Sequence, residues 1–296
     1  MKVSIFTFFL GFLFASFSVL GQAPASATLQ TDKREKCGTM ENHARRLAAD
    51  PTLEAKMQAQ EFDIQNWIAA NPVASSTSAS GKKIGTVVTI PVVVHVVYAN
   101  ATENVPDEQI FSQIEVLNED FRRLNADTGD TPDVWKGIAA DFEVEFCLAV
   151  RDPDGNPTTG ITRTSTTETS FSTNDDVKFD ATGGKDSWNT SEYLNIWVCD
   201  ISGSTIGYAE FPSGGFSNTW GIVITYWGFG KGGVTSAPYD VGRTGVHEVG
   251  HCFNLRHIWG DDGNLCVGSD NVADTPDQEG STGGCPTHPA LDNCSP

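Results

Sequence analysis

The chain has 296 residues, which suits one domain of catalytic size with smaller segments beside it. Hydrophobic residues make up 39% and charged residues 19% of it, so a wholly disordered chain is excluded. Acidic side chains number 38 and basic ones 19, giving a formal net charge of -19 at pH 7. Such a chain repels polyphosphate, which argues against nucleic acid as a partner.

The first residues are typical of a signal peptide. Lys2 precedes an apolar run over residues 5–20, and small residues follow this run. A membrane anchor is the alternative, but the run is short for a helix that spans a bilayer. We therefore expect residues 1–21 to be cleaved off during export. The mature chain is then secreted, to the extracellular space or the periplasm, with no membrane as a partner.

Residues 22–85 differ in composition from the rest of the chain. Residues 41–70 favour helix, and small polar residues then dominate residues 74–81, which is typical of a flexible, cleavable linker. A helical segment joined in this way to a larger domain is either a propeptide or a small independent module. We interpret it as a propeptide and assign residues 86–296 to the main domain.

Strands and helices are both predicted in the main domain. Residues 87–98 form a nearly continuous β-branched run, as in a strand buried on both faces, although Pro91 weakens the prediction for its beginning. An apolar stripe predicts a helix over residues 106–121. Further strands are predicted at residues 142–150, 193–199, 207–211 and 220–226. This order indicates an α/β (α+β) fold.

Two histidines one helical turn apart indicate the chemistry of the chain. On a helix, His247 and His251 project from the same face, close enough for both imidazoles to reach one zinc ion at about 2.0–2.1 Å. Glu248 lies beside them and can reach a metal-bound water without ligating the metal. That is the position which a general base requires.

A third histidine can join them only if the helix ends. Six further helical residues would carry His257 about 9 Å along the axis and to the far side of the helix. Asn254 lies midway, and Asn accepts the left-handed conformation that terminates helices. We therefore predict a turn at Asn254 that brings His257 back to the metal.

The alternative is that these histidines are ordinary core or surface residues of a buried helix. By chance, three His and one Glu take this spacing in on the order of one chain in ten thousand. Three protein ligands leave the fourth position of zinc open, which distinguishes a catalytic site from a structural one. The spacing therefore predicts a catalytic zinc site.

The motif resembles that of the metzincin zinc peptidases. Its surroundings, residues 242–246 and 258–261, are similar to the pappalysin family, especially its secreted bacterial members. The resemblance extends over residues 86–296, with Asn254 at a position where family members commonly carry Gly. It implies a secreted zinc endopeptidase that acts on protein or peptide substrates. It also implies a twisted, mostly parallel sheet over the active-site helix.

The resemblance further implies an edge strand that pairs with extended substrate. Gly207, Tyr208, Ala209 and Glu210 are the candidates for this strand. Substrate added to a strand gains main-chain hydrogen bonds and little sequence preference, which suits a protease acting on extended chains. In such a site Glu248 would deprotonate the water, and zinc would stabilise the oxyanion.

Metzincins continue beyond this motif to a tight turn that contains Met. The Met residues of this sequence are Met1, Met40 and Met57, so we expect the C-terminal subdomain to be missing. Either the sequence is truncated or the natural chain ends at Pro296. In the second case the metal site would lack its floor, and the chain could be a catalytically inactive zinc-binding module.

The resemblance also implies a disulfide. Cys266 and Cys285 flank a loop of the length that family members close with a disulfide, so we expect this pair. Cys294 resembles a residue whose family partner lies in the absent region, which leaves it unpaired. Cys147 and Cys199 end two strands and either form a bridge or stay free.

Cys37 resembles the propeptide cysteine of latent metzincins, whose thiolate occupies the fourth zinc position until the propeptide is removed. Lys33, Arg34 and Lys36 are expected to help ionise it. The alternative is an inert thiol in a loose tail. With Cys37 as a ligand, the chain is predicted to be a latent proenzyme.

An acidic segment follows the motif. Asp261, Asp262, Asp270, Asp274 and Asp277 supply oxygen ligands, and family members can bind calcium here. A solvated acidic loop is the alternative, and the irregular spacing of the carboxylates favours this alternative. A third hypothesis for the whole chain is an acidic adhesive β-domain with an incidental histidine cluster, which would bind no stoichiometric zinc.

Overall fold

The computed structural model describes residues 36–71, 87–263, 265–281 and 294. The predictions for residues 1–21, for the linker at 74–81 and for Cys285 lie outside these residues. The helices are α1 (Thr39–Ala49), α2 (Leu53–Ala70), α3 (Asp107–Phe121) and α4 (Arg243–Cys252). The strands are β1 (Val88–Tyr98), β2 (Val144–Leu148), β3 (Ile161–Ser165), β4 (Leu194–Cys199), β5 (Gly207–Ala209) and β6 (Ile222–Thr225). Short 3-10 turns are η1 (Ala126–Asp130), η2 (Asp176–Lys178), η3 (Asp180–Thr182) and η4 (Tyr226–Gly228).

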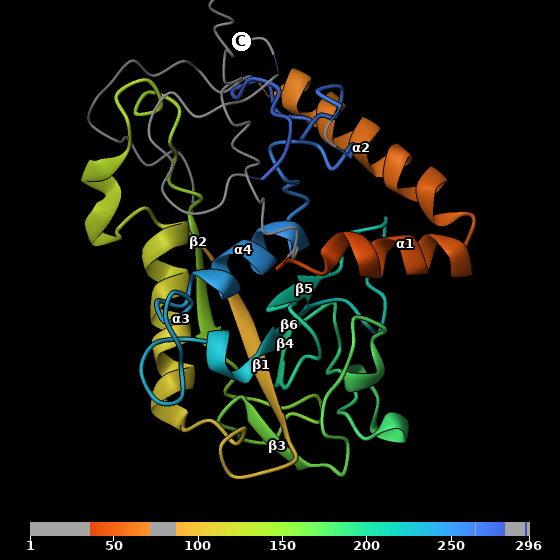
Figure 1. Ribbon diagram of the computed structural model, residues 1–296, viewed down its shortest axis with the longest axis vertical. Coiled ribbons are helices and arrows are strands. Elements are labelled where there is room, and N and C mark those ends of the chain that lie inside the picture. Colours follow the sequence, from red (N-terminus) through yellow and green to blue (C-terminus); the bar gives the residue numbers. More distant parts are fainter. Residues whose placement is uncertain (1–35, 72–86, 264, 282–293, 295–296) are drawn as a thin grey trace, which may run out of the picture. The chain divides into compact units, whose positions relative to one another are not determined.

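The strands form one mostly parallel sheet. Its order is β2-β1-β4-β6-β5, and β3 pairs with β1 beyond the end of β2. All pairings are parallel except that of β5 with β6, which is antiparallel. Figure 1 shows β1 running through the sheet, with α3 and α4 beside it. The predicted α/β fold with a mostly parallel sheet is confirmed, and β5 lies at an edge of that sheet, as expected.

The proline in β1 is accommodated by the register of the sheet. Pro91 lies opposite Cys147 of β2, whereas pairing with β4 on the other side begins only at Val92. A residue without an N–H group is tolerated where one side of a strand has no partner. The strand therefore includes Pro91, although this proline weakened the prediction for the first residues of the strand.

Each face of the sheet has its own core. On one face Val94, Ile196 and Ile222 pack with residues of α3 and α4, and all three are fully buried. On the other face Trp197, Tyr208 and Val223 pack under the segments around η2. Burial on both faces explains the uninterrupted β-branched sequences of β1, β4 and β6. α4, which carries the histidine motif, is thereby held against β5 and β6.

The N-terminal helices form a unit that packs against the end of β5. The helix predicted over residues 41–70 is two helices, because Pro51 favours a break between α1 and α2. Leu53 and Met57 pack on Phe211, which follows β5, and all three are at most 6% exposed. None of the helices in the described ranges is long and apolar enough to cross a membrane.

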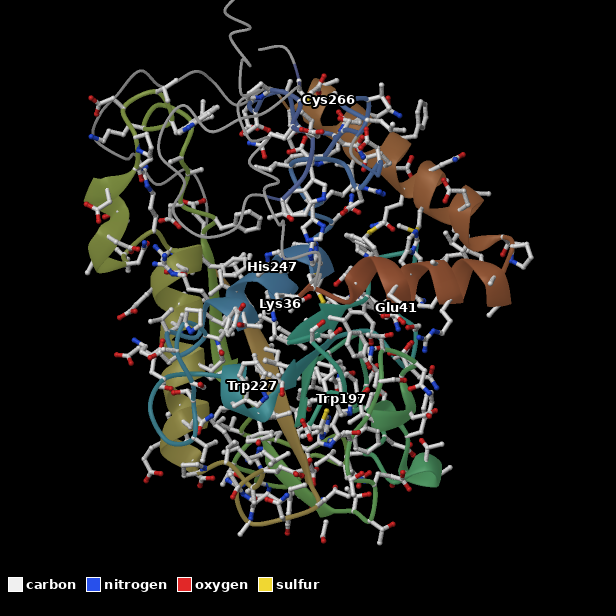
Figure 2. All side chains as sticks on the ribbon, in the orientation of Figure 1. Lys36, Glu41, Trp197, Trp227, His247 and Cys266 are labelled. Carbon is white, nitrogen blue, oxygen red and sulfur yellow. A yellow bond between two sulfur atoms is a disulfide. The ribbon has the colours of Figure 1, made fainter. Side chains whose placement is uncertain are left out.

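The expected pairing of Cys266 with Cys285 and the expectation that Cys294 is unpaired were both wrong. Cys266 is bonded to Cys294, with the two Cα atoms 5.4 Å apart, so it is not available to Cys285. The spacing of cysteines along a chain does not determine which two come within bonding distance, because the fold between them does. Figure 2 shows Cys266 at the top of the view, beyond α4. Cys147 and Cys199 are free thiols, one exposed and one buried.

One strand was not predicted. β3 pairs with β1 from Val94 to Tyr98, continuing the position of β2 along the same strand. Its sequence, Ile161-Thr162-Arg163-Thr164-Ser165, contains one strongly apolar residue, and only hydroxyl-bearing and basic side chains follow. Such a sequence has no clear alternation, so its strand is formed by the available partner rather than by its own pattern.

A buried histidine of the core gives the fold a pH dependence. The ring of His95 is fully buried between Thr162 and Asn195, and burial lowers its pKa to about 4. Below pH 6.5 the imidazole of His95 binds a proton in the unfolded chain but not in the folded chain. The free energy of unfolding therefore falls as the pH falls towards 4. We expect the free energy of unfolding to drop by about 3 kcal/mol over this range through His95 alone.

This contribution is measured by urea denaturation of the native chain and of His95→Gln between pH 7.5 and 4. The difference in the free energy of unfolding between the two proteins should shrink as the pH falls. Parallel pH profiles would show that His95 does not titrate as described.

Candidate active site and metal centre

The helix that carries two of the histidines is fixed by small residues. α4 begins after Gly242, whose positive φ of 74° allows the sharp entry into the helix. A Cβ atom on Gly245 would lie 2.5 Å from the amide nitrogen of Gln113 in α3, so Gly permits the close packing of the two helices. The Gln113 side chain in turn donates to the carbonyl of Gly242 at 2.9 Å. His247 and His251 therefore project from a rigid helix.

The predicted turn at Asn254 is confirmed. α4 ends at Cys252, and Asn254 has a φ of 67°, in the left-handed region. Its N–H donates to the carbonyl of His251 at 2.9 Å, and the N–H of Leu255 donates to that of Gly250 at 3.0 Å. These bonds satisfy the last carbonyls of the helix and reverse the chain. His257 is thereby returned towards His247 and His251.

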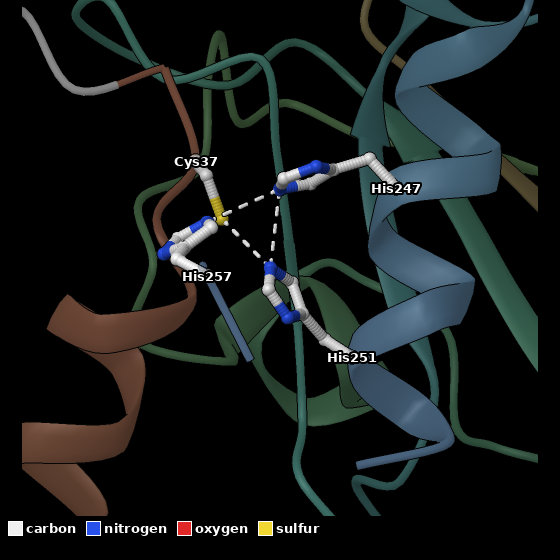
Figure 3. Close-up of side chains that lie close together, drawn as sticks. All are labelled: Cys37, His247, His251 and His257. Carbon is white, nitrogen blue, oxygen red and sulfur yellow. Dashed lines mark hydrogen bonds between the residues drawn. The ribbon is translucent and has the colours of Figure 1, made fainter. Parts of the chain in front are cut away.

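Four side chains converge at this point. The ligand atoms of Cys37, His247, His251 and His257 all lie within 4.8 Å of one another (Figure 3). The Nε2 atom of His247 lies 3.1 Å from that of His251 and 3.3 Å from that of His257. Tetrahedral ligands at 2.0–2.1 Å from one ion are separated by about 3.3 Å. The three imidazoles therefore fit a single metal ion.

The rings of His251 and His257 are oriented for metal binding by hydrogen bonds of their Nδ1 atoms. Nδ1 of His251 donates to the carbonyl of Leu255 at 2.7 Å, and Nδ1 of His257 donates to Asp261 at 2.8 Å. The indole of Trp259 stacks on His257 at 4.3 Å and donates to Asp261 at 3.0 Å. Bonds of this kind fix the tautomer that leaves Nε2 free to bind a metal.

His247 and His251 are neutral at pH 7. Burial lowers the pKa of His251 to about 3. His247 is the most exposed of the three, yet desolvation of its ring inside the cluster lowers its pKa to about 4. Neutral imidazole is the form that binds a metal ion, because a protonated ring has no free lone pair.

Glu248 lies directly beside the cluster and is 1% exposed. Its Oε2 atom accepts a hydrogen bond from the hydroxyl of Thr39 at 3.1 Å and lies 3.8 Å from Sγ of Cys37. Burial raises the pKa of this carboxyl to about 8. A Cβ on Gly207 would lie 2.9 Å from Cγ of Glu248, so Gly207 leaves room for the carboxylate. A raised pKa at a partly apolar site suits a group that exchanges protons.

Cys37 lies against the same ring cluster, with Sγ 3.5 Å from Nε2 of His251. A sulfur and a nitrogen bound to one tetrahedral ion are separated by about 3.5 Å. The expectation that basic neighbours ionise this thiol was wrong for the metal-free chain, because burial and the charge of Glu248 raise its pKa. The ammonium of Lys36 is directed elsewhere, lying 6.0 Å from the ring centre of Tyr239. Lys33 and Arg34 lie outside the described residues.

The segment around Cys37 covers the edge of the sheet. The N–H of Gly38 donates to the carbonyl of Gly207 at 2.8 Å, and the N–H of Ile206 donates to the carbonyl of Lys36 at 2.8 Å. The hydroxyl of Thr39 accepts from the N–H of Ala209 at 2.9 Å. Residues 36–39 therefore take the main-chain groups of β5 that an added strand would use.

The acidic segment after the motif uses its carboxylates within the protein. Asp261 accepts from His257 and Trp259, and Asp262 accepts from the N–H groups of Val267 and Gly268, both at 2.7 Å. Asp270 accepts from the N–H of Val272 at 3.0 Å. Within the described residues, the group with metal-ligand geometry is the cluster of Cys37 with the three histidines.

Sequence reasoning missed the residues that support this site. Thr39, Asp261 and Trp259 contact Glu248 or His257, and Arg46 of α1 forms an ion pair with Glu210 at 2.6 Å. A signal existed for Asp261, because a carboxylate is a common partner of the second ring nitrogen of a metal-binding histidine. The sequence holds no signal for the roles of Thr39 and Arg46, because their partners Glu248 and Glu210 lie far away along the chain.

The carboxylate behind His257 should tune the metal affinity. Asp261→Asn keeps the left-handed backbone, which Asn tolerates at the φ of 53°, but weakens the bond to Nδ1. We expect the metal to bind about 10–100-fold more weakly. Competition with a chelator of known affinity measures this loss, and Asp154→Asn, in an exposed turn, is the matched control. Equal affinity in the two variants would refute the orienting role.

Comparisons with known proteins indicate the family of this chain. The family model described as pregnancy-associated plasma protein-A, a peptidase family, matches residues 174–295. Mature mirolysin of Tannerella forsythia, solved with a cleaved peptide, is 54% identical with a TM-score of 0.69, over 71% of this chain and 79% of that chain. A promirolysin variant of the same organism is 47% identical with a TM-score of 0.74, over 88% of this chain and 82% of that chain.

A more distant relative carries a name of the same kind. The extracellular metalloprotease of Arthroderma benhamiae is 28% identical over 225 residues, which are 74% of this chain and 69% of that protein. The resemblance seen in the sequence is confirmed by a relative of 54% identity of which this chain covers more than two thirds. The chain therefore belongs to the pappalysin family of metzincin-like metalloendopeptidases.

Proposed function

We propose that this chain is the latent precursor of a secreted zinc-dependent endopeptidase. His247, His251 and His257 are the zinc ligands, and Glu248 is the general base. The observation that carries the proposal is the convergence of three Nε2 atoms at separations of 3.1 and 3.3 Å from His247, next to a buried carboxylate. Imidazole ligands on a tetrahedral site favour zinc among the common metals.

The chemistry follows from the positions of these groups. When bound, zinc acts as a Lewis acid that acidifies water and polarises the scissile carbonyl. Glu248 lies within reach of the cluster but is not one of its converging ligands, so it is free to take the proton of the attacking water and pass it to the leaving amine. In the precursor, burial raises the pKa of this carboxyl to about 8, so it binds a proton more readily than an exposed glutamate does.

Peptide substrate is proposed to bind along β5. Gly207, Tyr208, Ala209 and Glu210 form or follow this edge, and the groups that would pair with a substrate are those now taken by residues 36–39. Peptide as the substrate class is supported by mirolysin, which was solved with a cleaved peptide. Secretion is supported by relatives named extracellular metalloproteases and by the signal-like residues 1–21.

Latency is proposed to reside in residues 22–85. Cys37 supplies a fourth ligand at the cluster, Thr39 bonds to the carboxylate of Glu248, and α1 follows directly. A promirolysin structure among the neighbours supports a proenzyme form in this family. Removal of this segment would open the fourth ligand position and the sheet edge together. Calcium stays outside the proposed cofactor set, because the carboxylates of Asp261 and Asp262 already bind protein donors.

Replacement of the general base tests the assigned chemistry. In Glu248→Gln we expect peptide cleavage by the activated protein to fall by about 10²–10⁴-fold while zinc stays bound. Peptide hydrolysis and elemental analysis of the same sample measure the two quantities. Zinc without any cleavage by the native protein would instead support the inactive zinc-binding module, and retained activity of the variant would contradict the role of Glu248.

Replacement of the proposed fourth ligand tests latency. Cys37→Ser puts a weaker zinc ligand at the site, and we expect the uncleaved precursor to gain activity by roughly tenfold or more. The matched control is Cys147→Ser, because Cys147 is a free, exposed thiol outside the cluster. Turnover of a quenched peptide by uncleaved protein is the measurement. If both variants match the native precursor, Cys37 is not the latency ligand.

A further inference from the structure

An arginine lies next to the third histidine of the cluster, and the proposed chemistry does not use it. Arg256 directly precedes His257, and its guanidinium carbon lies 5.4 Å from the ring centre of Phe211. The ring of Phe211 meets the ring of His251 edge to face, with the two centres 5.3 Å apart. The guanidinium is therefore separated from the histidine cluster by one aromatic ring.

Phe211 lies on the face of the sheet that carries the histidine cluster. Ala209, the last residue of β5, packs in the core of this face together with Val249 of α4. The ring of Phe211, two residues further along the chain, contacts His251 of the same helix. A peptide that lies along β5 and over the cluster would therefore pass Phe211 and the neighbouring Arg256.

The N-terminal helices cover Phe211. Leu53 and Met57 of α2 pack on its ring, and the ring of His43 of α1 meets it edge to face at 5.7 Å. With these neighbours Phe211 is 1% exposed. Removal of α1 and α2 would uncover an apolar ring and the guanidinium of Arg256 side by side, close to the metal site.

A cavity of about 310 Å³ lies between these helices and the main domain. Glu54 and Glu61 line it from α2, whereas Arg256, Ser269 and Asn271 line it from the main domain. The side chains of these three main-domain residues carry a guanidinium, a hydroxyl and an amide, all of which can donate hydrogen bonds to an anion. The part of the cavity wall that the main domain supplies therefore suits a carboxylate.

The guanidinium of Arg256 has unused capacity for hydrogen bonds. Its Nε atom is buried and has no hydrogen-bond partner in the described part of the chain. Its position over the ring of Phe211 holds the planar group without using its N–H donors. Departure of α2 would also take the carboxylates of Glu54 and Glu61 away from the cavity. An incoming carboxylate would restore a negative charge beside Arg256.

We propose that Arg256 and Phe211 form a subsite of the mature enzyme that selects an acidic side chain, of glutamate or aspartate, in the peptide substrate. The carboxylate pairs with the guanidinium, whose planar fork can donate two parallel bonds, and the aliphatic part of the side chain packs on the ring. This inference rests on the proposed endopeptidase function.

The test measures cleavage of peptides in which Glu is moved through the four positions on each side of one scissile bond. Each peptide is compared with one that has Gln at the same position, because Gln has nearly the shape of Glu without its charge. For the native protein, matured by removal of its N-terminal segment, kcat/KM should be about tenfold higher for Glu at one of these positions. A rise in salt concentration from about 0.05 M to about 0.5 M should reduce this ratio.

Variants of Arg256 assign the preference to its charge. In Arg256→Gln the Glu-to-Gln ratio should fall to about one, and Arg256→Lys should keep part of the ratio, because it retains the charge without the fork. Arg256→Glu should reverse the preference, so that Lys is favoured over Gln at the same position. Arg151→Gln, at an exposed position in a turn, is the matched control and should keep the full ratio.

Elemental analysis of each variant checks that zinc is still bound at the neighbouring histidines. The salt series uses the native enzyme alone, so it still tests the subsite if a variant fails to fold.

The outcomes separate the subsite from the function on which it rests. A native enzyme that cleaves the peptides with no preference for Glu at any position overturns the subsite and leaves the endopeptidase standing. An unchanged ratio in Arg256→Gln, or a ratio that does not respond to salt, has the same meaning. Absence of cleavage of every peptide by the native matured protein overturns the proposed function, and the subsite with it.

Discussion

The site depends on one constraint, which is that a helix must stop before its third histidine. Two imidazoles on one helical face can hold a metal only from one side, and a longer helix would carry His257 away from them. Asn254 reverses the chain by adopting a left-handed conformation, and the carbonyls of Gly250 and His251 are satisfied in the process. A β-branched residue at this position would strain the turn, because it disfavours a positive φ. The cluster of histidines therefore depends on the backbone conformation at Asn254 as well as on the histidine side chains themselves.

The second determinant is that one segment contacts the histidine cluster, its neighbouring carboxylate and the edge strand together. Residues 36–46 contact the histidine cluster through Cys37, the carboxylate of Glu248 through Thr39 and the carboxylate of Glu210 through Arg46. Each of these contacts has a different chemistry, namely a thiol against an imidazole, a hydroxyl bonded to a carboxylate, and an ion pair. A segment that satisfies all three need not bind tightly through any one of them, because its contacts act together on a single chain. The edge of β5 adds main-chain hydrogen bonds to the same engagement.

The sequence predicted those parts of the fold whose patterns are local. The β-branched runs typical of strands buried on both faces predicted the strands at residues 87–98 and 193–199. The helical spacing of two histidines, together with the turn at Asn254, predicted that three histidine side chains lie in one cluster. β3 was not predicted because its own sequence has no strand pattern, and it forms a strand because β1 is available to pair with it. The predicted partner of Cys266 was wrong for a related reason, because the distance between two cysteines along the chain does not determine their distance in space.

The environment of side chains was the least predictable feature. Basic residues near Cys37 in the sequence suggested an ionised thiol, yet Lys36 lies over Tyr239 and the thiol is buried beside Glu248. Charges act through space, and the composition of neighbouring positions says little about which of them face a given group. The same limit applies to Arg46 and Glu210, which are separated by more than half of the chain's length.

The pairing of residues 36–39 with β5 has a consequence beyond catalysis. An edge strand with open N–H and C=O groups is the surface through which sheets of separate molecules join and aggregate. While the N-terminal segment is in place, the outward groups of Ile206, Gly207 and Ala209 are bonded within the same chain. The segment therefore also covers this edge against sheet-to-sheet association. Without the segment, the short length of β5, three residues, would limit the surface left open to such association.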